Sequence, residues 1–385
     1  MTAPTAVNRA GGNNVPDDVD ARLARVLQGL VAQRGVHHAN IAITSGDGEQ
    51  RWSAAASRSD DQRLRPETPF FIASITKRFV ITLVLQAYER GELDLAAPIN
   101  DYLSTDVITG IHVLRGIDRT SEITVRHLAT HTSGLPDHFE KRRDGPSRYE
   151  SLAAGRDSAW TFEDTMRVTR EQQRPYFEPQ DLTAPRQKAR YSDTGFQLLI
   201  RILETVTDRS FADLLTERIL DPLGLRHTWH PRHHPADPAT AAPTPLYAKQ
   251  RRLTLTSLIE SSNDLFSTTA DLLTFQRALL GGALFQDART SEVLTERRNR
   301  LRNIPILRYG MGTMFFQVSR LVSPTRRPLT LVGHSGATGT WLFHCPELDL
   351  HLVGTVDQAK GQAIPFQAMA RLLSGWRRSD RGRFL

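Results

Sequence analysis

The first strong periodic pattern of apolar residues lies between Asp18 and Gly35, in the segment VDARLARVLQGLVAQRG. Apolar side chains recur there every three or four positions, which places them on one face of a helix. Asp17 or Asp18 is suited to cap the start of this helix, and Gly35 to end it. We therefore predict a packed amphipathic helix. Its buried face would consist of Val19, Leu23, Val26, Leu27, Leu30 and Val31.

Patterns typical of strands stand near both ends of the chain. The segment NIAITSGDGEQRWSAAA is typical of a strand, a Gly-Asp-Gly turn and a returning strand. From Phe70 to Leu301 the pattern favours helices, interrupted by polar or proline-rich loops at 137–150, 174–190 and 230–245. After Leu329, the segments TLVGHS, GTWLFHC and LDLHLVGTV predict three successive strands, and IPFQAMARLLSGWRR predicts a closing amphipathic helix.

This order of elements predicts an α/β (α+β) fold. An antiparallel sheet would be built from both chain ends and flanked by the terminal helices, with a mainly helical domain inserted between them. A substrate cleft would lie where the two parts meet. The expected division is a disordered tail at 1–17, a sheet domain formed by 18–69 and 305–385, and a helical domain at 70–304.

Composition and charge narrow the class of protein. Of the 385 residues, 39% are hydrophobic and 24% are charged, as in ordinary globular proteins. No stretch reaches the ~20 apolar residues of a membrane-spanning helix, and the start of the chain lacks a signal-peptide pattern. We therefore expect a cytoplasmic protein without a membrane span. The formal net charge of +7 is not accompanied by a nucleic-acid-binding module, so we expect a solvated arginine-rich surface and no nucleic-acid partner.

Ser74 and Lys77 carry the main chemical signal. They are three residues apart, so on a helix both side chains point the same way within contact distance. The sequence around and after them is apolar nearly all round, which predicts a helix in the interior with Lys77 inside it. A buried lysine without strong pairing loses basicity and can accept the proton of a neighbouring hydroxyl. The backbone N–H of a serine at a helix start can stabilise an oxyanion.

Four segments extend this signal across most of the chain: FIASITK, LATHTSGLPD, RYSDTGFQLL and GHSGATGTWLF. Their order resembles that of the penicillin-recognising serine hydrolases. This superfamily includes class C β-lactamases, D-amino-acid peptidases and β-lactamase-like carboxylesterases. The resemblance implies a β-lactamase/transpeptidase-like fold and a nucleophilic serine at position 74.

The resemblance also implies roles for residues outside the Ser74 helix. Tyr191 would be the second proton-handling group: a phenol whose pKa is lowered by a neighbouring lysine can act as a base and then as the acid that protonates the leaving group. The Ala337 N–H would be the second oxyanion donor beside that of Ser74, and Gly336 would let the ligand approach the strand backbone. His334 and Ser335 would begin the motif that binds substrate.

Two positions depart from the usual pattern of this superfamily. Asp193 stands where asparagine is more common; its carboxylate only accepts hydrogen bonds and would hold Lys77 protonated. The alternative role for Asp193 is a helix N-cap. His334 stands where β-lactamases usually carry lysine, and a neutral imidazole would not hold a substrate carboxylate. The second departure argues against β-lactams as the main substrates.

Together these features predict a serine hydrolase that works through an acyl-enzyme, and we favour a carboxylesterase acting on a small-molecule ester. Amide hydrolysis remains open, by a β-lactamase, a D-amino-acid peptidase or a cyclic-amide hydrolase, and so does acyl transfer. An alternative outside the enzymes is a non-catalytic receptor that keeps the penicillin-binding shape to sense a ligand or a partner. No cofactor is implied, and no pattern indicates an oligomeric state.

Other candidate sites have weaker support. GHSGA resembles the nucleophile elbow of α/β-hydrolases, which would make Ser335 the nucleophile, but a strand rather than a helix is predicted after it. Histidines at 227, 230, 233 and 234 lie in a proline-rich loop without a carboxylate pattern, so we predict no metal site there. His131 is expected to be structural, and Cys345 to be a buried thiol in a strand.

Overall fold

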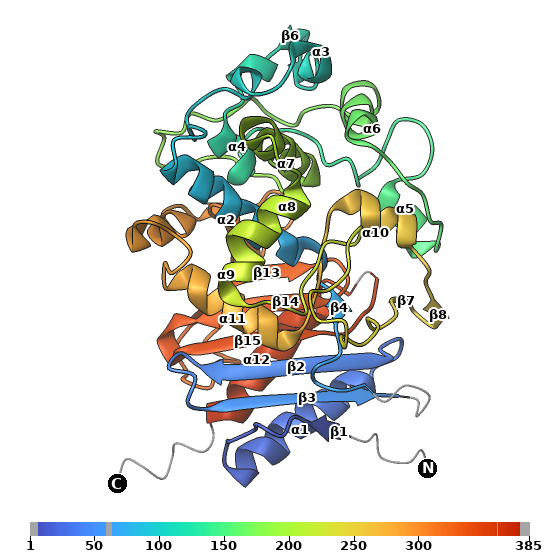
Figure 1. The fold of residues 1–385 in the computed structure, drawn as a ribbon, viewed down its shortest axis with the longest axis vertical. Coiled ribbons are helices and arrows are strands. Elements are labelled where there is room, and N and C mark those ends of the chain that lie inside the picture. The colour runs from blue at the N-terminus through green and yellow to red at the C-terminus, as the bar shows by residue number, and fades with distance from the viewer. Residues whose placement is uncertain (1–6, 59–63, 360, 378–385) are drawn as a thin grey trace.

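The computed structural model describes residues 7–58, 64–359 and 361–377. These residues include a nine-stranded antiparallel sheet with the order β1-β3-β2-β15-β14-β13-β12-β11-β10 (Figure 1). Strands from the two chain ends meet where β2 pairs with β15, with Ile41 opposite Gly354. The strands are β1 (Val7–Arg9), β2 (His38–Ser45), β3 (Arg51–Ser57), β10 (Asn299–Arg300), β11 (Leu307–Tyr309), β12 (Met314–Val318), β13 (Leu329–Gly336), β14 (Thr340–Cys345) and β15 (Leu350–Thr355).

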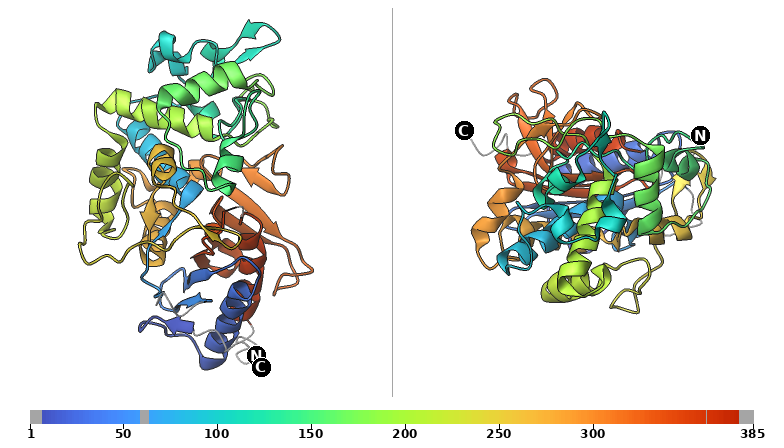
Figure 2. Two further views of the ribbon diagram at one scale, coloured as in Figure 1. Left: turned by 90° about the vertical axis from the view of Figure 1, so that its right-hand side faces the viewer. Right: turned by 90° about the horizontal axis from the view of Figure 1, so that it is seen from above.

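The predicted fold class is confirmed. The early hairpin forms β2 and β3, and the three strands predicted after Leu329 are β13, β14 and β15. The inserted helices lie toward one end of the molecule, and the sheet with the blue and red terminal helices lies toward the other (Figure 2). β10 falls on the helical side of the expected border at residue 304. The division into domains stays a prediction.

Two helices cover one face of the sheet. The predicted N-terminal helix is α1 (Asp17–Val31), and it packs against the closing helix α12 (Ile364–Arg377). The predicted apolar face of α1 is buried except for Val26, which is partly buried. Pro16, and not an aspartate, occupies the N-cap position. The aspartates therefore lie in the first turn, where negative charge interacts favourably with the helix dipole.

The expectation of a disordered tail at 1–17 is wrong for its second half. Residues 7–9 form the edge strand β1, which pairs with β3. Asn13 binds the backbone of Ser53 at both its N–H (2.7 Å) and its carbonyl (3.1 Å). This pairing uses backbone groups and amide side chains, so the polar composition of the segment did not reveal it. Residues 1–6 lie outside the described residues.

The insertion packs its longest helices against the other face of the sheet and against each other. α2 (Thr76–Glu89) contacts α7 (Asp193–Thr207), and α11 (Thr269–Leu280) contacts β2, β14 and β15. The rings of Phe79 on α2 and Phe275 on α11 stack with centroids 3.7 Å apart. All residues from Thr76 to Ala87 are buried, so α2 runs through the interior. The predicted interior helix is therefore confirmed.

The remaining elements are short. The α-helices are α3 (Thr105–Ile108), α4 (Val125–Ala129), α5 (Arg148–Ala153), α6 (Phe162–Arg167), α8 (Phe211–Leu215), α9 (Asp221–Leu223) and α10 (Thr256–Ser262). Other helical turns are η1 (Ala73–Ile75), η2 (Ile99–Asp101), η3 (Thr120–Glu122), η4 (Val168–Gln172), η5 (Thr216–Leu220), η6 (Ala288–Leu294) and η7 (Pro346–Leu348). Small two-stranded sheets pair β4 (Phe70–Phe71) with β9 (Phe266–Ser267), β5 (Val113–Leu114) with β6 (Ile117–Asp118), and β7 (Tyr247–Ala248) with β8 (Arg251–Arg252). Within the described ranges, none of the helices combines the length and apolar character needed to cross a membrane.

Candidate active site

Ser74 lies in the turn η1, immediately before α2. Every residue from 70 to 87 is buried except Ser74, which is partly exposed. The preceding residue, Ala73, has a φ of 47°, a left-handed conformation that is costly for a residue with a Cβ. A strained backbone of this kind persists only where its surroundings hold it. The apolar segment thus places one accessible hydroxyl at the surface of an otherwise closed core.

Strand β13 holds this turn from the other side. A Cβ atom on Gly336 would lie 2.9 Å from the Ala73 Cβ and 2.1 Å from the Thr340 Oγ1. Thr340 in turn donates a hydrogen bond to the Ile72 carbonyl at 3.1 Å. Only glycine fits at 336, because the turn that carries the nucleophile packs directly on it. The predicted role of Gly336 in admitting a ligand stays a prediction.

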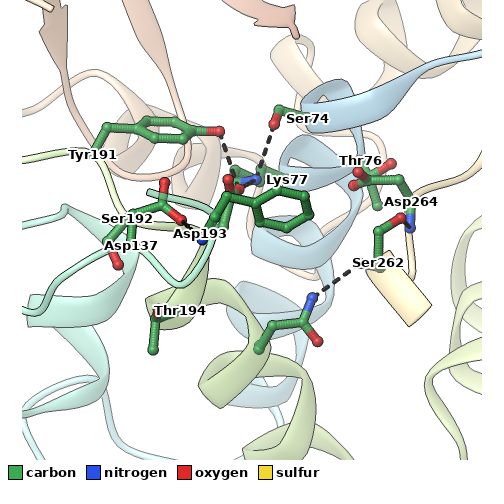
Figure 3. A network of polar contacts seen from close by, with 12 residues as sticks. Ser74, Thr76, Lys77, Asp137, Tyr191, Ser192, Asp193, Thr194, Ser262 and Asp264 are labelled. Atoms are coloured by element: carbon green, nitrogen blue, oxygen red, sulfur yellow. Dashed lines mark hydrogen bonds and ion pairs between the residues drawn. The ribbon is translucent and has the colours of Figure 1, made fainter. Parts of the chain in front are cut away.

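Lys77 connects Ser74 to an acidic group. Its Nζ lies 3.1 Å from the Ser74 Oγ and forms an ion pair with Asp193 (Figure 3). The Lys77 and Asp193 side chains are only 6% and 13% exposed. Burial alone would lower the pKa of Lys77, but the carboxylates of Asp193 and Asp264 outweigh burial and raise it above its usual value. Lys77 is therefore an ammonium at rest. Of the two roles considered for Asp193, it takes that of the Lys77 partner, since Ser192 occupies the N-cap of α7.

Tyr191 points into the same group of side chains (Figure 3). Its hydroxyl lies 3.5 Å from the Asp193 Oδ1, and the Lys77 Nζ lies 5.2 Å from the centre of its ring. Burial, and then the charge of Asp193, raise the pKa of Tyr191 well above the usual value of a phenol. The expected lowering of this pKa by the neighbouring lysine is therefore wrong, and at neutral pH Tyr191 is a proton donor. Ser74 and Lys77 from one motif and Tyr191 and Asp193 from another are thus brought together.

The backbone around Tyr191 is fixed by two other segments. The Asn303 amide accepts from the Tyr191 N–H at 3.0 Å and donates to its carbonyl at 3.2 Å. The Ser192 N–H donates to the His131 Nδ1 at 3.3 Å, and the His131 and Tyr191 rings pack with centroids 4.6 Å apart. Burial, followed by the charge of Lys77, lowers the pKa of His131 well below its usual value. A neutral His131 thus positions the Tyr191 segment, which agrees with a structural role.

The residues of the GHSGATGTWLF segment are divided between the pocket and the interior. Ala337 lines the pocket with Ser74, whereas the His334 ring is fully buried. The His334 Nδ1 lies 2.8 Å from the Ser335 carbonyl oxygen, which can only accept, so Nδ1 carries the proton and Tyr309 donates to Nε2 at 3.1 Å. Burial, and then the charge of Lys77, lower the pKa of His334 well below its usual value. The His334 ring is therefore neutral, as expected. The predicted contact of His334 with substrate stays a prediction, and the full burial of the ring argues against it. Substrate contacts of Ser335 and an oxyanion role of the Ala337 N–H also stay predictions.

The pocket beside Ser74 is small, with a volume of about 50 Å³. Sequence reasoning missed two ionisable residues in its wall. Tyr149 on α5 donates from its hydroxyl to the Asp193 Oδ2 at 3.4 Å. Asp264 follows α10, and burial raises the pKa of its carboxyl to about 7. Tyr149 lies in the 137–150 segment that we treated only as a loop, and Asp264 lies in a turn without a recognisable motif.

The other candidate groups do not join this site. Within the parts of the chain that the structure describes, no cluster of three or more histidine, cysteine or acidic residues could hold a metal ion. His230 instead lies 3.2 Å from the Asn263 Oδ1. Cys345 is buried in β14, and burial raises the pKa of its thiol to about 12, as expected for a structural cysteine.

Known proteins are similar to this chain in sequence and in fold. The sequence model of the family described as Beta-lactamase matches residues 23–373. Similar curated proteins include penicillin-binding protein 4 of Amycolatopsis lactamdurans, 28% identical over 203 residues (51% of this chain and 46% of that protein). Esterase EstB of Burkholderia gladioli is 35% identical over 121 residues, or 30% of this chain and 29% of that protein. The chain spans about half the length of the first curated relatives that it matches.

Solved structures show the same fold over nearly the whole chain. The D-stereospecific amidohydrolase from Streptomyces sp. has a TM-score of 0.72 and 24% sequence identity, and the alignment covers 94% of this chain and 99% of that one. EstCE1, described as a hydrolase with promiscuous acyltransferase activity, has a TM-score of 0.70 and 18% identity, with 93% and 98% covered. At these identities the likeness concerns the fold.

Proposed function

Because the chain belongs to the Beta-lactamase family, we propose that it is a serine hydrolase that forms an acyl-enzyme on Ser74. The observation that carries this proposal is the contact of the partly exposed Ser74 hydroxyl with Lys77, at 3.1 Å, inside a group that also contains Asp193 and Tyr191. A hydroxyl becomes a nucleophile when a positioned group takes its proton, and this arrangement offers one.

The contacts support a closed path for one proton. Ser74 gives its hydroxyl proton to Lys77 while Lys77 passes one of its own to Asp193, and the Ser74 oxygen bonds to the substrate carbonyl carbon. When the tetrahedral intermediate collapses, the bond to the leaving group breaks and Tyr191 protonates that group. Asp193 then returns its proton to Tyr191, across the 3.5 Å between them. Lys77 remains an ammonium and Tyr191 a phenol, the states that their surroundings favour.

The oxyanion of the intermediate would rest on the backbone N–H groups of Ser74 and Ala337, which line one pocket. Water attacking the acyl-enzyme would use the same proton path in reverse. Where another nucleophile reaches the carbonyl first, the outcome is acyl transfer.

We favour an ester as the bond that is cleaved. Position 334 carries a neutral histidine where a lysine that binds a carboxylate is usual. Position 193 carries an aspartate where asparagine is usual, and its carboxylate cannot donate a hydrogen bond to an amide carbonyl. Amide hydrolysis is the second candidate, because the phenol of Tyr191 stays protonated at neutral pH and could serve as the acid that an amine leaving group needs. The expected cytoplasmic location stays a prediction.

The first experiment is mass spectrometry of the intact protein after mixing with p-nitrophenyl acetate, a fluorophosphonate and a penicillin in separate samples, followed by peptide mapping. We expect an adduct on Ser74 from the ester or the fluorophosphonate. Ser74→Ala should lose the adduct and the turnover. An unchanged turnover in Ser74→Ala would refute the nucleophile, and no adduct from any reagent would favour the non-catalytic receptor.

A further inference from the structure

Carboxylates outnumber cations in the wall of the Ser74 pocket. Asp193 and Asp264 both line it, and Lys77 is the only lysine or arginine among the described residues that do so. The ion pair with Asp193 already neutralises Lys77. When both carboxylates are ionised, the pocket therefore has one negative charge in excess; because burial raises the pKa of Asp264 to about 7, this charge is present on part of the molecules at pH 7 and on most of them above it.

The positive groups outside this wall do not restore the balance. His131 and His334 are held neutral by burial and by the charge of Lys77. Arg78 is fully buried and directs its Nη1 to the Thr313 hydroxyl. A substrate carboxylate in the pocket would therefore meet Asp193 and Asp264 without a free cation to bind.

Asp264 is placed to receive a cation instead. It borders the pocket, and its backbone N–H donates to the Ser262 Oγ at 3.1 Å, which anchors the turn (Figure 3). Its carboxyl group is hydrogen-bonded by the Thr76 and Ser262 side chains, and the Lys77 ammonium acts on it across the site. Within the described chain it forms no ion pair within contact distance. Burial makes its ionised form costly, and an ammonium brought in by a ligand would relieve that cost.

We propose that the pocket selects substrates whose short acyl part carries a protonated amine, with Asp264 as the carboxylate that binds this amine. This inference rests on the proposed serine hydrolase. The small volume of the pocket, about 50 Å³, favours an acyl part of a few heavy atoms. The substrate class is thus esters or amides of small amino acids or similar amino acyl groups.

Three methyl esters of nearly the same shape test the charge preference. They are the esters of alanine, isobutyric acid and methylmalonic acid (its monomethyl ester), which place an ammonium, a methyl group and a carboxylate at one position. Values of kcat/KM at pH 7, where an α-amino group is mostly protonated, are divided by the hydroxide-catalysed rate constant of each ester. We expect the cation to exceed the neutral ester by at least about tenfold, and the neutral ester to exceed the anion by a similar factor.

A charge-removing variant assigns the preference to Asp264. Asp264→Asn should lower the alanine-to-isobutyrate ratio by about tenfold, whereas the matched change Asp106→Asn, at an exposed position on α3, should leave the ratio unchanged. Inhibition of the unmodified enzyme by propylammonium, compared with propionate, provides a measurement that does not depend on a variant that folds. Preference for the neutral or anionic ester, or stronger inhibition by propionate, would overturn the inference.

The two proposals can fail separately. If Ser74 forms the fluorophosphonate adduct but the ester series shows no preference for the cation, the serine hydrolase stands and the substrate class falls. If no ester turns over and no adduct forms on Ser74, the proposed function itself is wrong.

Discussion

Replacing Asp193 by asparagine tests the proton path at its central group. Asp193→Asn keeps the shape of the side chain but removes the charge that pairs with Lys77. In the proposed path, Asp193 accepts the proton that leaves Lys77, and an amide cannot do so at neutral pH. Lys77 then has to lose a proton to solvent before it can accept one from Ser74.

The expected magnitude follows from this loss. Positioned proton transfer contributes about 10²–10⁴ to the rate, so we expect kcat/KM at pH 6 to fall by at least about 100-fold. The variant also loses the group that raises the pKa of Lys77, while burial, which lowers it, remains. The neutral amine therefore becomes more abundant as pH rises, and the activity deficit should shrink with it. Breaking a buried ion pair costs about 3–5 kcal/mol of stability, so folding is checked by thermal unfolding.

The assay is kcat/KM for p-nitrophenyl acetate from pH 6 to pH 9, compared for wild type, Asp193→Asn and the exposed control Asp106→Asn. The control should follow the wild type throughout. A folded Asp193→Asn protein whose rates match the wild type across the pH range would refute the role of Asp193 in proton transfer. A large deficit that does not change with pH would refute the role assigned to the Lys77 amine in the variant.

Three further changes give separate outcomes. Tyr191→Phe should reduce kcat/KM for an amide by at least about 100-fold. It should reduce kcat/KM for p-nitrophenyl acetate far less, because p-nitrophenolate leaves without a proton. Equal losses for the two substrates would contradict the role of Tyr191 as the acid. Gly336→Ala should lower the free energy of unfolding by about 1–3 kcal/mol, because the added Cβ would collide with Thr340 and Ala73. The variant should also lose labelling of Ser74 by a fluorophosphonate. Normal labelling would contradict this packing argument. Asp357 is buried and is not among the residues that line the pocket. Burial raises its pKa from 3.8 to about 7, so its contribution to stability is fully present below about pH 4 and is lost as pH rises to about 7. Asp357→Asn should therefore gain stability relative to wild type, up to roughly 4 kcal/mol at pH 8 and less at pH 5, in urea unfolding at both values; a gain that is larger at pH 5 would contradict the sign.

The fold was predictable where the sequence carries strong periodicity. The 3.6-residue period of α1 describes one face that must be buried, and that face is buried. The strands β13, β14 and β15 are buried on both faces, as expected for runs of mainly apolar residues. The edge strand β1 escaped prediction because its contacts are made by backbone groups and by Asn13. The backbone pairing of an edge strand does not require a pattern of apolar residues, so the sequence does not indicate it.

The site was predictable only where a motif names its residues. Ser74 and Lys77 lie one turn apart, and the resemblance supplied Tyr191. Tyr149 and Asp264 reach the pocket through tertiary packing of α5 and of the turn after α10, and no spacing in the sequence relates them to Ser74. Such residues are selected by the geometry of the folded chain, so a single sequence does not reveal them.

The unusual residues at 193 and 334 are connected through the charge of the site. Burial lowers the pKa of Arg78 to about 10, so it stays a cation at neutral pH, and Lys77 beside it is an ammonium. A lysine at 334 would add a third cation in the field of both, whereas His334, hydrogen-bonded by Tyr309, fills the position without charge. Asp193 then cancels the charge of Lys77 on the pocket side. Both departures make the site less positive: His334 leaves out the charge of a lysine, and Asp193 cancels the charge of Lys77. Such a site offers little attraction to an anionic substrate.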